Sequence, residues 1–259
     1  MAARVTVGVS LKMYFGHREA LDWCARVASL AETHPAVAGG AVELFIIPTY
    51  LQILPALGAF DGTPVLVGAQ DVTTEDSGAF TGEVSAVELA EVGVAVVEIG
   101  HAERRRLFGD TDEVVAAKTR AALRNGIAPV LCLGETERLS APDAAAIVLA
   151  QLDSALAEAP AGRVVVAYEP VWAIGAPEPA PAEHIRVVGD ALRAHVAGLV
   201  DREESSVIYG GSAKPGLLAT LGDSVDGLFL GRFAHDPDAL AAVLDEAAEL
   251  AAARHQVAS

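Results

Sequence analysis

The chain has 259 residues, of which 52% are hydrophobic, and its formal net charge is −17. This length suffices for one barrel-sized core or two smaller ones, and the acidic balance argues against nucleic acid or an anionic membrane surface as a partner. An anionic ligand must therefore be held by local groups. The apolar run Val5–Val9 is too short for a signal sequence or a membrane span, so we expect a cytoplasmic protein.

Short apolar runs alternate along the chain with longer stretches rich in Ala, Leu and Glu. The short runs are β-branched and predict buried strands at Val5–Val9, Val42–Ile47, Val65–Val67, Val94–Ile99, Ala128–Leu133, Val164–Ala167, Ser206–Ile208 and Gly227–Leu230. Apolar residues at helical spacing predict helices at Arg18–Glu32, Asp112–Asn125, Asp143–Glu158, Ala182–Val200 and Pro237–Arg254. This alternation is typical of a parallel sheet covered by helices.

About eight strand–helix units in roughly 250 residues fit a closed (β/α)8 barrel, an α/β fold of eight parallel strands. The alternative is an open doubly wound sheet, but no Gly-x-Gly-x-x-Gly turn follows the first strand. No linker rich in Pro, Gly or Ser divides the chain, so we predict one domain over residues 1–259. Cys24 and Cys132 lack metal-ligand spacing and lie far apart, so we expect two core residues and neither a disulfide nor a metal site.

Chemically useful residues follow the predicted strands at their carboxyl ends, where the active sites of such barrels lie. Lys12 follows the first strand, His101 the fourth and Glu169 the sixth. Glycine turns follow the last two strands, as Gly210-Gly211-Ser212 and Gly231. We therefore expect an acid–base pair, a cation and two glycine turns to converge on one face.

Glu169 stands at the centre of this prediction. Pro170 ends the strand before it can continue, and Val171, Trp172 and Ile174 are too apolar for an ordinary solvated turn, so they suggest a lid. The alternative is a carboxylate at a strand end that a local hydrogen bond satisfies.

The other candidates have structural alternatives as well. Lys12 could be a solvated lysine, although it comes directly after a buried strand. His101 could be a hydrogen-bonded structural histidine, but Glu103 and Arg104 suggest a short helix whose amino terminus would disfavour a positive imidazole. Gly210-Gly211 could be only a tight turn, yet glycine also lets backbone N–H groups close on a phosphate.

Seven sequence blocks resemble the triosephosphate isomerase family, along nearly the whole chain. They are Leu11-Lys12-Met13, Val67-Gly68-Ala69-Gln70, Gly78-Ala79-Phe80-Thr81-Gly82-Glu83, Ile99-Gly100-His101-Ala102-Glu103-Arg104-Arg105, Cys132-Leu133-Gly134-Glu135, Tyr168-Glu169-Pro170-Val171-Trp172-Ala173-Ile174-Gly175 and Tyr209-Gly210-Gly211-Ser212. The resemblance implies the TIM barrel of that family and its proton-transfer chemistry.

By this resemblance, Glu169 removes a carbon-bound proton next to a carbonyl and gives a cis-enediolate. His101 polarises the carbonyl and moves protons between the oxygens, Lys12 stabilises the developing negative charge, and Glu103 contacts that lysine. The implied phosphate-binding groups are Gly175, Ser212 and the N–H groups of Gly211 and Gly231. The lid would exclude water, and no metal or organic cofactor is implied.

Three departures from the family pattern surround the expected substrate. Ser10 replaces a usual Asn, the segment Ala176-Pro177-Glu178-Pro179 replaces a Thr-Gly-Lys type of hinge, and Gly231-Arg232 replaces Gly-Gly. The Arg232 guanidinium could donate to a phosphate or a substrate hydroxyl, or it could lie along the barrel rim. Ala102 in place of a usual Ser is a minor change.

These features resemble the tetrulose-phosphate isomerases that interconvert erythrulose phosphates, so we favour a four-carbon ketose phosphate as substrate. The alternative is an authentic triosephosphate isomerase of glycolysis and gluconeogenesis, acting on dihydroxyacetone phosphate and glyceraldehyde 3-phosphate. A non-catalytic sugar-phosphate sensor is less favoured, because Lys12, His101 and Glu169 are all retained.

The segment Asp71–Gly82 is long for a loop between a strand and a helix, and such loops are usually functional. In the resembled family this loop inserts into a neighbouring subunit beside its catalytic lysine. We therefore expect a homodimer with Phe80, Thr81 and Glu83 near the contact. The alternative is a solvated excursion of the loop.

Overall fold

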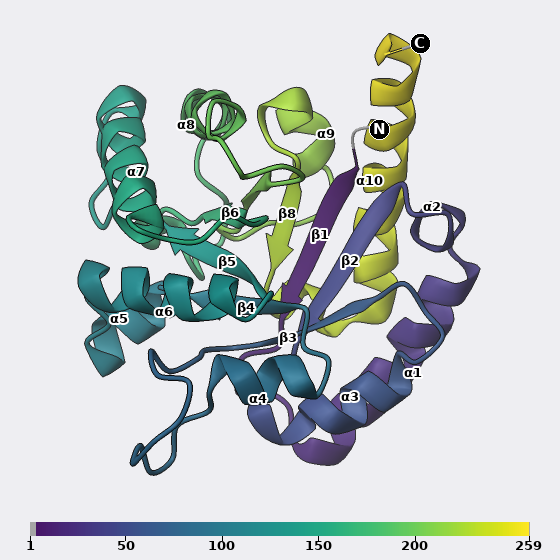
Figure 1. The fold of residues 1–259 in the computed structure, drawn as a ribbon. Coiled ribbons are helices and arrows are strands. Elements are labelled where there is room, and N and C mark those ends of the chain that lie inside the picture. Colours follow the sequence, from purple (N-terminus) through teal and green to yellow (C-terminus); the bar gives the residue numbers. More distant parts are fainter. Residues whose placement is uncertain (1–3, 259) are drawn as a thin grey trace.

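In the computed structural model, which describes residues 4–258, parallel strands β1 to β8 close into a barrel in chain order (Figure 1). The strands are β1 Val5–Ser10, β2 Val42–Ile47, β3 Leu66–Ala69, β4 Val96–Ile99, β5 Ala128–Leu133, β6 Val165–Tyr168, β7 Ser206–Tyr209 and β8 Gly227–Leu230. β8 pairs with β1 through Thr6 opposite Gly227, which closes the ring. The predicted (β/α)8 barrel is confirmed, whereas the predicted domain limits, residues 1 and 259, lie outside the described residues.

Helices surround the barrel. They are α1 His17–Thr33, α2 Pro35–Ala38, α3 Ile53–Ala59, α4 Ala86–Glu91, α5 Ala102–Phe108, α6 Asp112–Arg124, α7 Ala141–Leu156, α8 Ala182–Ala197, α9 Leu217–Leu221 and α10 Pro237–Ala258, with 3-10 turns η1 Tyr50–Gln52, η2 Val171–Ala173, η3 Gly222–Ser224 and η4 Arg232–His235. The five helices predicted by range are confirmed as α1, α6, α7, α8 and α10. Most of the others are too short to show helical periodicity in the sequence.

Several strands end one or two residues beyond the predicted apolar runs. β3, for example, continues through Gly68 and Ala69. A side chain at Gly68 would lie 2.6 Å from Cγ2 of Val96 and 2.8 Å from Cγ1 of Ile47, so glycine is required where strands crowd the barrel interior. Glycine within a strand can therefore mark close packing, which an apolar count does not detect.

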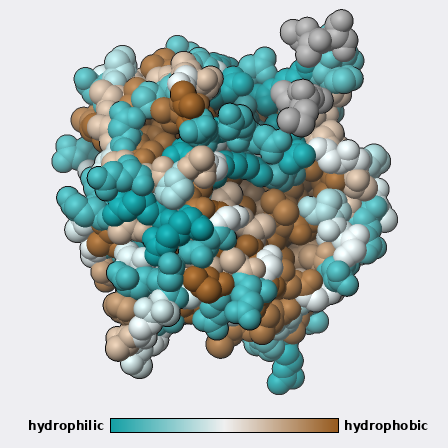
Figure 2. Space-filling model, viewed as in Figure 1, coloured by the Kyte–Doolittle hydropathy of each residue, from teal (hydrophilic) through white to brown (hydrophobic). Residues whose placement is uncertain are grey.

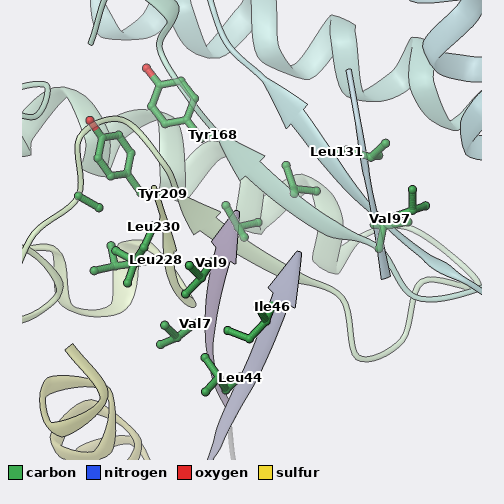
Figure 3. Packing of buried hydrophobic residues seen from close by; sticks show 14 of the residues in the cluster. Val7, Val9, Leu44, Ile46, Val97, Leu131, Tyr168, Tyr209, Leu228 and Leu230 are labelled. Atoms are coloured by element: carbon green, nitrogen blue, oxygen red, sulfur yellow. The ribbon is translucent and has the colours of Figure 1, made fainter. Parts of the chain in front are cut away.

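Two hydrophobic clusters lie on the two faces of the sheet. Outside the barrel, Val7 and Val9 of β1 lie beside Leu44 and Ile46 of β2 and pack against the helices (Figure 3). A second cluster fills the interior, with side chains from Phe45, Ile47, Val96, Val130, Cys132, Val165, Ala167, Ile208 and Phe229. Since apolar side chains fill most of this interior, space for a ligand is expected at the carboxyl ends of the strands.

Both cysteines are free, and both are buried, as predicted for core residues. Cys24 belongs to the outer cluster and Cys132 to the interior one. Among residues 4–258, no helix is long and apolar enough to cross a membrane.

Candidate active site

A cavity of about 820 Å³ opens at the carboxyl ends of the strands. The predicted site residues that line it are Ser10, Lys12, His101, Glu103, Glu169, Gly175, Gly210, Ser212, Gly231 and Arg232. Gly211 does not line the cavity. A side chain at Gly211 would lie 2.5 Å from the Tyr209 hydroxyl, so the packing of Tyr209 also requires a glycine there. Residues that follow β1, β4, β6, β7 and β8 are thus brought together as predicted.

His101 caps the amino terminus of α5 and is only 4% exposed. Its Nδ1 accepts a hydrogen bond of 3.1 Å from the backbone N–H of Glu103. Burial, together with the positive charge of Lys12, lowers the pKa of His101 to about 4. The ring is therefore neutral near pH 7, and since Nδ1 is an acceptor, its proton resides on Nε2, the nitrogen nearer Glu169.

Glu169 follows β6 and is 6% exposed. Its Oε2 is buried without a hydrogen-bond partner and lies 3.7 Å from Nε2 of His101. Burial raises the pKa of Glu169 to about 8, and the negative charge of Glu98 adds to this effect. A carboxyl group with a free buried oxygen and a pKa near neutrality is suited to accept a proton as a general base.

Lys12, the second residue after β1, adopts a left-handed backbone conformation with φ of 47°. Its carbonyl oxygen accepts a hydrogen bond of 2.9 Å from Nε2 of Gln70, and its Nζ lies 3.0 Å from Oε1 of Glu103. Burial opposes the charge of Lys12, but Glu169 and Glu103 outweigh burial and raise its pKa above the ordinary value. The ammonium group therefore stays charged beside the acid–base pair.

The lining of the cavity carries more positive than negative side chains, although the whole chain has a net charge of −17. The cations are Lys12, Arg105, Arg106, Lys214 and Arg232, and the carboxylates are Glu103, Asp112 and Glu169. This local excess of positive charge suits an anionic ligand. We expected such local groups because the chain as a whole is acidic.

Comparison with known proteins agrees with this geometry. The family model for triosephosphate isomerase matches residues 5–247. The chain belongs to the triosephosphate isomerase family.

Two relatives in this family carry different names. The chain is 53% identical over 248 residues to an L-erythrulose-1-phosphate isomerase of Pectobacterium atrosepticum, covering 94% of this chain and 96% of the relative. It is 44% identical over 214 residues to a triosephosphate isomerase of Leifsonia xyli subsp. xyli, covering 79% and 83%. The predictions of this family and of an isomerase are confirmed.

The segment predicted as a lid is bonded at both ends to residues at the end of β7. The Ser212 hydroxyl lies within hydrogen-bond distance of two lid carbonyls, those of Ala173 at 2.8 Å and Ala176 at 2.9 Å. The N–H of Ala180 donates to the Tyr209 hydroxyl at 3.0 Å. These bonds hold the segment before and after its two prolines.

The predicted lid residues do not all face the cavity. Val171 and Ile174 line it, but Trp172 does not. The Trp172 indole donates a hydrogen bond of 2.8 Å to Oε1 of Glu135 and stacks edge-on against His184. The expectation that Trp172 itself covers the cavity is thus wrong, because its polar N–H has a buried carboxylate partner outside the cavity.

Arg232 lies at the rim of the cavity, where its guanidinium is 5.6 Å from the centre of the Tyr14 ring. Tyr14 in turn contacts the His235 ring edge-on at 5.3 Å. The side chain therefore lies along the barrel rim and also lines the cavity, and its role as a donor to a phosphate or a substrate hydroxyl stays a prediction.

Sequence reasoning missed three features of the site. Glu98 was included in an apolar strand, although it is a charged residue in a buried run and could have been singled out. Gly134 was noted only as part of a matching block, yet a side chain there would lie 2.0 Å from the carbonyl oxygen of Glu169. Lys214 lines the cavity and pairs with Glu178 at 2.7 Å, a contact that no local pattern predicts.

Proposed function

We propose that this isomerase moves a carbonyl group along a small ketose phosphate through a cis-enediolate, and that a tetrulose phosphate is its preferred substrate. The observation that carries the reaction is the pair formed by Glu169 and His101, in which a free buried carboxylate oxygen lies 3.7 Å from the imidazole Nε2. The cation-rich lining of the cavity supports a phosphorylated substrate.

In the proposed reaction, the Glu169 carboxylate takes a proton from the carbon next to the carbonyl. Nε2–H of His101 donates to the carbonyl oxygen while Lys12 stabilises the negative charge that develops there. The imidazole then recovers a proton from the neighbouring hydroxyl, and Glu169 returns its proton to the adjacent carbon. The carbonyl has moved by one carbon, and every group of the enzyme is restored.

Further roles are proposed for the residues around this pair. Glu103 orients Lys12 through their contact of 3.0 Å. Gly175, Gly210, Ser212 and Gly231 would surround the phosphate, with Arg232 as a charged donor at the rim. Val171 and Ile174 would exclude water, which protects an enediolate phosphate from losing its phosphate group.

The substrate preference rests on the relative named L-erythrulose-1-phosphate isomerase, which is 53% identical over 96% of its length. Such a substrate extends a triose phosphate by one hydroxymethyl group at the carbon that loses its proton. A triose phosphate is the alternative substrate, because a relative that is 44% identical is named triosephosphate isomerase.

The deciding measurement is kcat/KM for an erythrulose phosphate and for glyceraldehyde 3-phosphate, side by side on the purified protein. We expect the tetrulose to be preferred. A triose kcat/KM near the diffusional ceiling of about 10⁸–10⁹ M⁻¹s⁻¹, which this family is known to reach, would overturn the preference.

A Glu169→Asp variant tests catalysis itself. It withdraws the carboxylate by about 1 Å, so we expect a loss on the order of 10²-fold in kcat with either substrate. Calorimetric binding of the sugar phosphate should change little. If the wild-type protein binds sugar phosphates but turns none over, the protein is a sensor and the proposal is wrong.

We also infer that the protein acts as a homodimer through the loop between β3 and α4, which projects from the barrel (Figure 1). Large apolar side chains are exposed nearby, after β1, β2 and β3: Met13 is 88% exposed, Leu51 85% and Phe80 46%. Figure 2 shows hydrophobic surface over α3 and α4 on the same side. Such surface is usually covered by a partner.

The dimer and its location have simple tests. A Phe80→Asp substitution should shift sedimentation from dimer to monomer and lower activity, whereas Val200→Asp, an exposed site in the segment after α8, should change neither. A wild-type monomer that is fully active would contradict the dimer. Fractionation of cells should find the protein in the cytoplasm.

A further inference from the structure

A carboxyl group lies in the barrel interior beneath the cavity. Glu98 is the third residue of β4 and is 3% exposed, in a strand whose four residues are all buried. One of its oxygens, Oε2, accepts a hydrogen bond of 2.8 Å from the hydroxyl of Ser10 on β1. Because β1 and β4 are not neighbours in the barrel, this contact crosses the interior.

The hydrogen bonding of this carboxyl group is incomplete. Among residues 4–258, the Ser10 hydroxyl is its one hydrogen-bond donor, although a carboxylate can accept about four. Burial raises the pKa of Glu98 to about 7, an indication that its ionised form is poorly compensated. An isolated buried carboxylate destabilises a fold, so the fold itself gives no reason to keep one here.

The position of Glu98 relates it to the reacting groups. Its Oε1 lies 3.9 Å from Nε2 of His101, and Oε2 of Glu169 lies 3.7 Å from the same nitrogen. Both carboxyl groups therefore border the position at which a substrate would present its carbonyl oxygen to Nε2. In the proposed reaction, Glu169 faces the carbon that loses its proton. Glu98 is then left to face a substituent on that carbon.

We propose that Glu98, held by Ser10, is a specificity-determining residue that binds a hydroxyl on the substituent of the carbon that loses its proton. This inference rests on the proposed function and names the group that recognises the fourth carbon. A hydroxymethyl substituent supplies an O–H donor for the free carboxylate oxygen. Triose phosphates lack that carbon and leave the carboxyl group unpaired, which disfavours them.

Ser10 contributes both contact and space. Its side chain is shorter than the asparagine usual in the resembled family, and it is oriented by its bond to Glu98. Ser10 lines the cavity, and the nearly buried Glu98 lies next to it across their hydrogen bond of 2.8 Å. A short polar residue beside the carboxylate leaves room for one extra carbon and its oxygen, which a longer amide would occupy.

The test compares two substrates on three proteins. The substrates are L-erythrulose 1-phosphate and its 4-deoxy analogue, in which a methyl group replaces the terminal hydroxymethyl group. The proteins are the wild type, Glu98→Val, and Glu98→Gln, which keeps the shape of the side chain and an acceptor for Ser10. A Thr6→Val variant serves as control, because Thr6 is also buried on β1 but lies four residues before Ser10.

We expect the wild type to prefer the hydroxylated substrate in kcat/KM by about 10- to 100-fold, the effect of one hydrogen bond to a charged group. Glu98→Val should abolish this preference by losing activity only on the hydroxylated substrate, and Glu98→Gln should retain part of it. Thr6→Val should keep the full preference. A structural role for Glu98 would lower both substrates equally and would overturn the inference.

Failure of the inference differs from failure of the proposed function. If the wild type converts L-erythrulose 1-phosphate and Glu98→Val keeps the wild-type preference, the inference is wrong and the proposed function stands. If the wild type does not convert L-erythrulose 1-phosphate, the proposed substrate is wrong and the inference falls with it.

Discussion

Gly210 sets the position of the proposed base, and Gly210→Ala should displace that base without altering its chemistry. A methyl group at this position would lie 2.6 Å from Oε1 and 2.8 Å from Cγ of Glu169. Non-bonded contact is comfortable only from about 3.5 Å, so the carboxylate must retreat by roughly 0.9 Å. The backbone of Gly210 is not left-handed, so alanine itself introduces no torsional strain.

A displacement of about 1 Å can lower the rate on the order of 10²-fold when the displaced group must meet a reacting atom. We therefore expect Gly210→Ala to lose about 10²-fold in kcat, with a destabilisation of about 1–3 kcal/mol from overpacking. The assays are initial rates on an erythrulose phosphate and thermal unfolding by calorimetry.

The matched control is Gly198→Ala, at the exposed end of α8, where the nearest atom to an added methyl is 3.4 Å away. It should change neither rate nor binding. If Gly210→Ala folds and keeps its rate within threefold of the wild type, the contact with Glu169 does not set the position of the base, and the reasoning is refuted.

Three further predictions follow from other parts of the structure. Since burial and Glu98 raise the pKa of Glu169 to about 8, kcat/KM should rise with pH up to about 8, and Glu98→Gln should move this inflection to lower pH in a pH–rate profile. Lys118→Met removes the ammonium group that pairs with the buried carboxylates of Asp71 and Asp110, so urea unfolding should show a free energy of unfolding lower by about 3–5 kcal/mol. Ser212→Ala removes two contacts with lid carbonyls, so amide exchange in the lid should accelerate about 10-fold by mass spectrometry.

Each of these predictions has a result that would contradict it. An inflection near pH 4.5 would show that Glu169 is not perturbed in solution. Unchanged urea stability of Lys118→Met would mean that Arg104, which lies 2.8 Å from Asp71, compensates for the lost ammonium. Unchanged exchange in Ser212→Ala would show that other contacts hold the lid.

The barrel could be predicted because buried parallel strands and amphipathic helices leave different periodicities in the sequence. The positions of Lys12, His101 and Glu169 could be predicted for the same reason, since the strand ends fix where they must lie. A neutral His101 was predicted from the short helix suggested by Glu103 and Arg104, which the structure contains as α5, but burial and the charge of Lys12 are what lower its pKa.

Other parts of the site depend on contacts between distant segments. The bond from Ser10 to Glu98 joins residues 88 positions apart across the barrel. The orientation of Trp172 depends on Glu135, 37 positions away. Local sequence patterns carry no information on such pairs. Neither the hydrogen bond between Ser10 and Glu98 nor the direction of the Trp172 indole could therefore be predicted from the sequence.

The division between an outer and an inner cluster also bears on how such enzymes diverge. Residues that hold the helices to the barrel, such as Val7, Val9, Leu44 and Ile46, point away from the cavity. Side chains along a strand point alternately to its two faces, so Ser10 points opposite to Val7 and Val9, toward Glu98. An exchange at such an inward position can alter which ligand fits without disturbing the contacts between barrel and helices. A single substitution at the carboxyl end of a strand can thus change the substrate of such an enzyme while its fold stays the same.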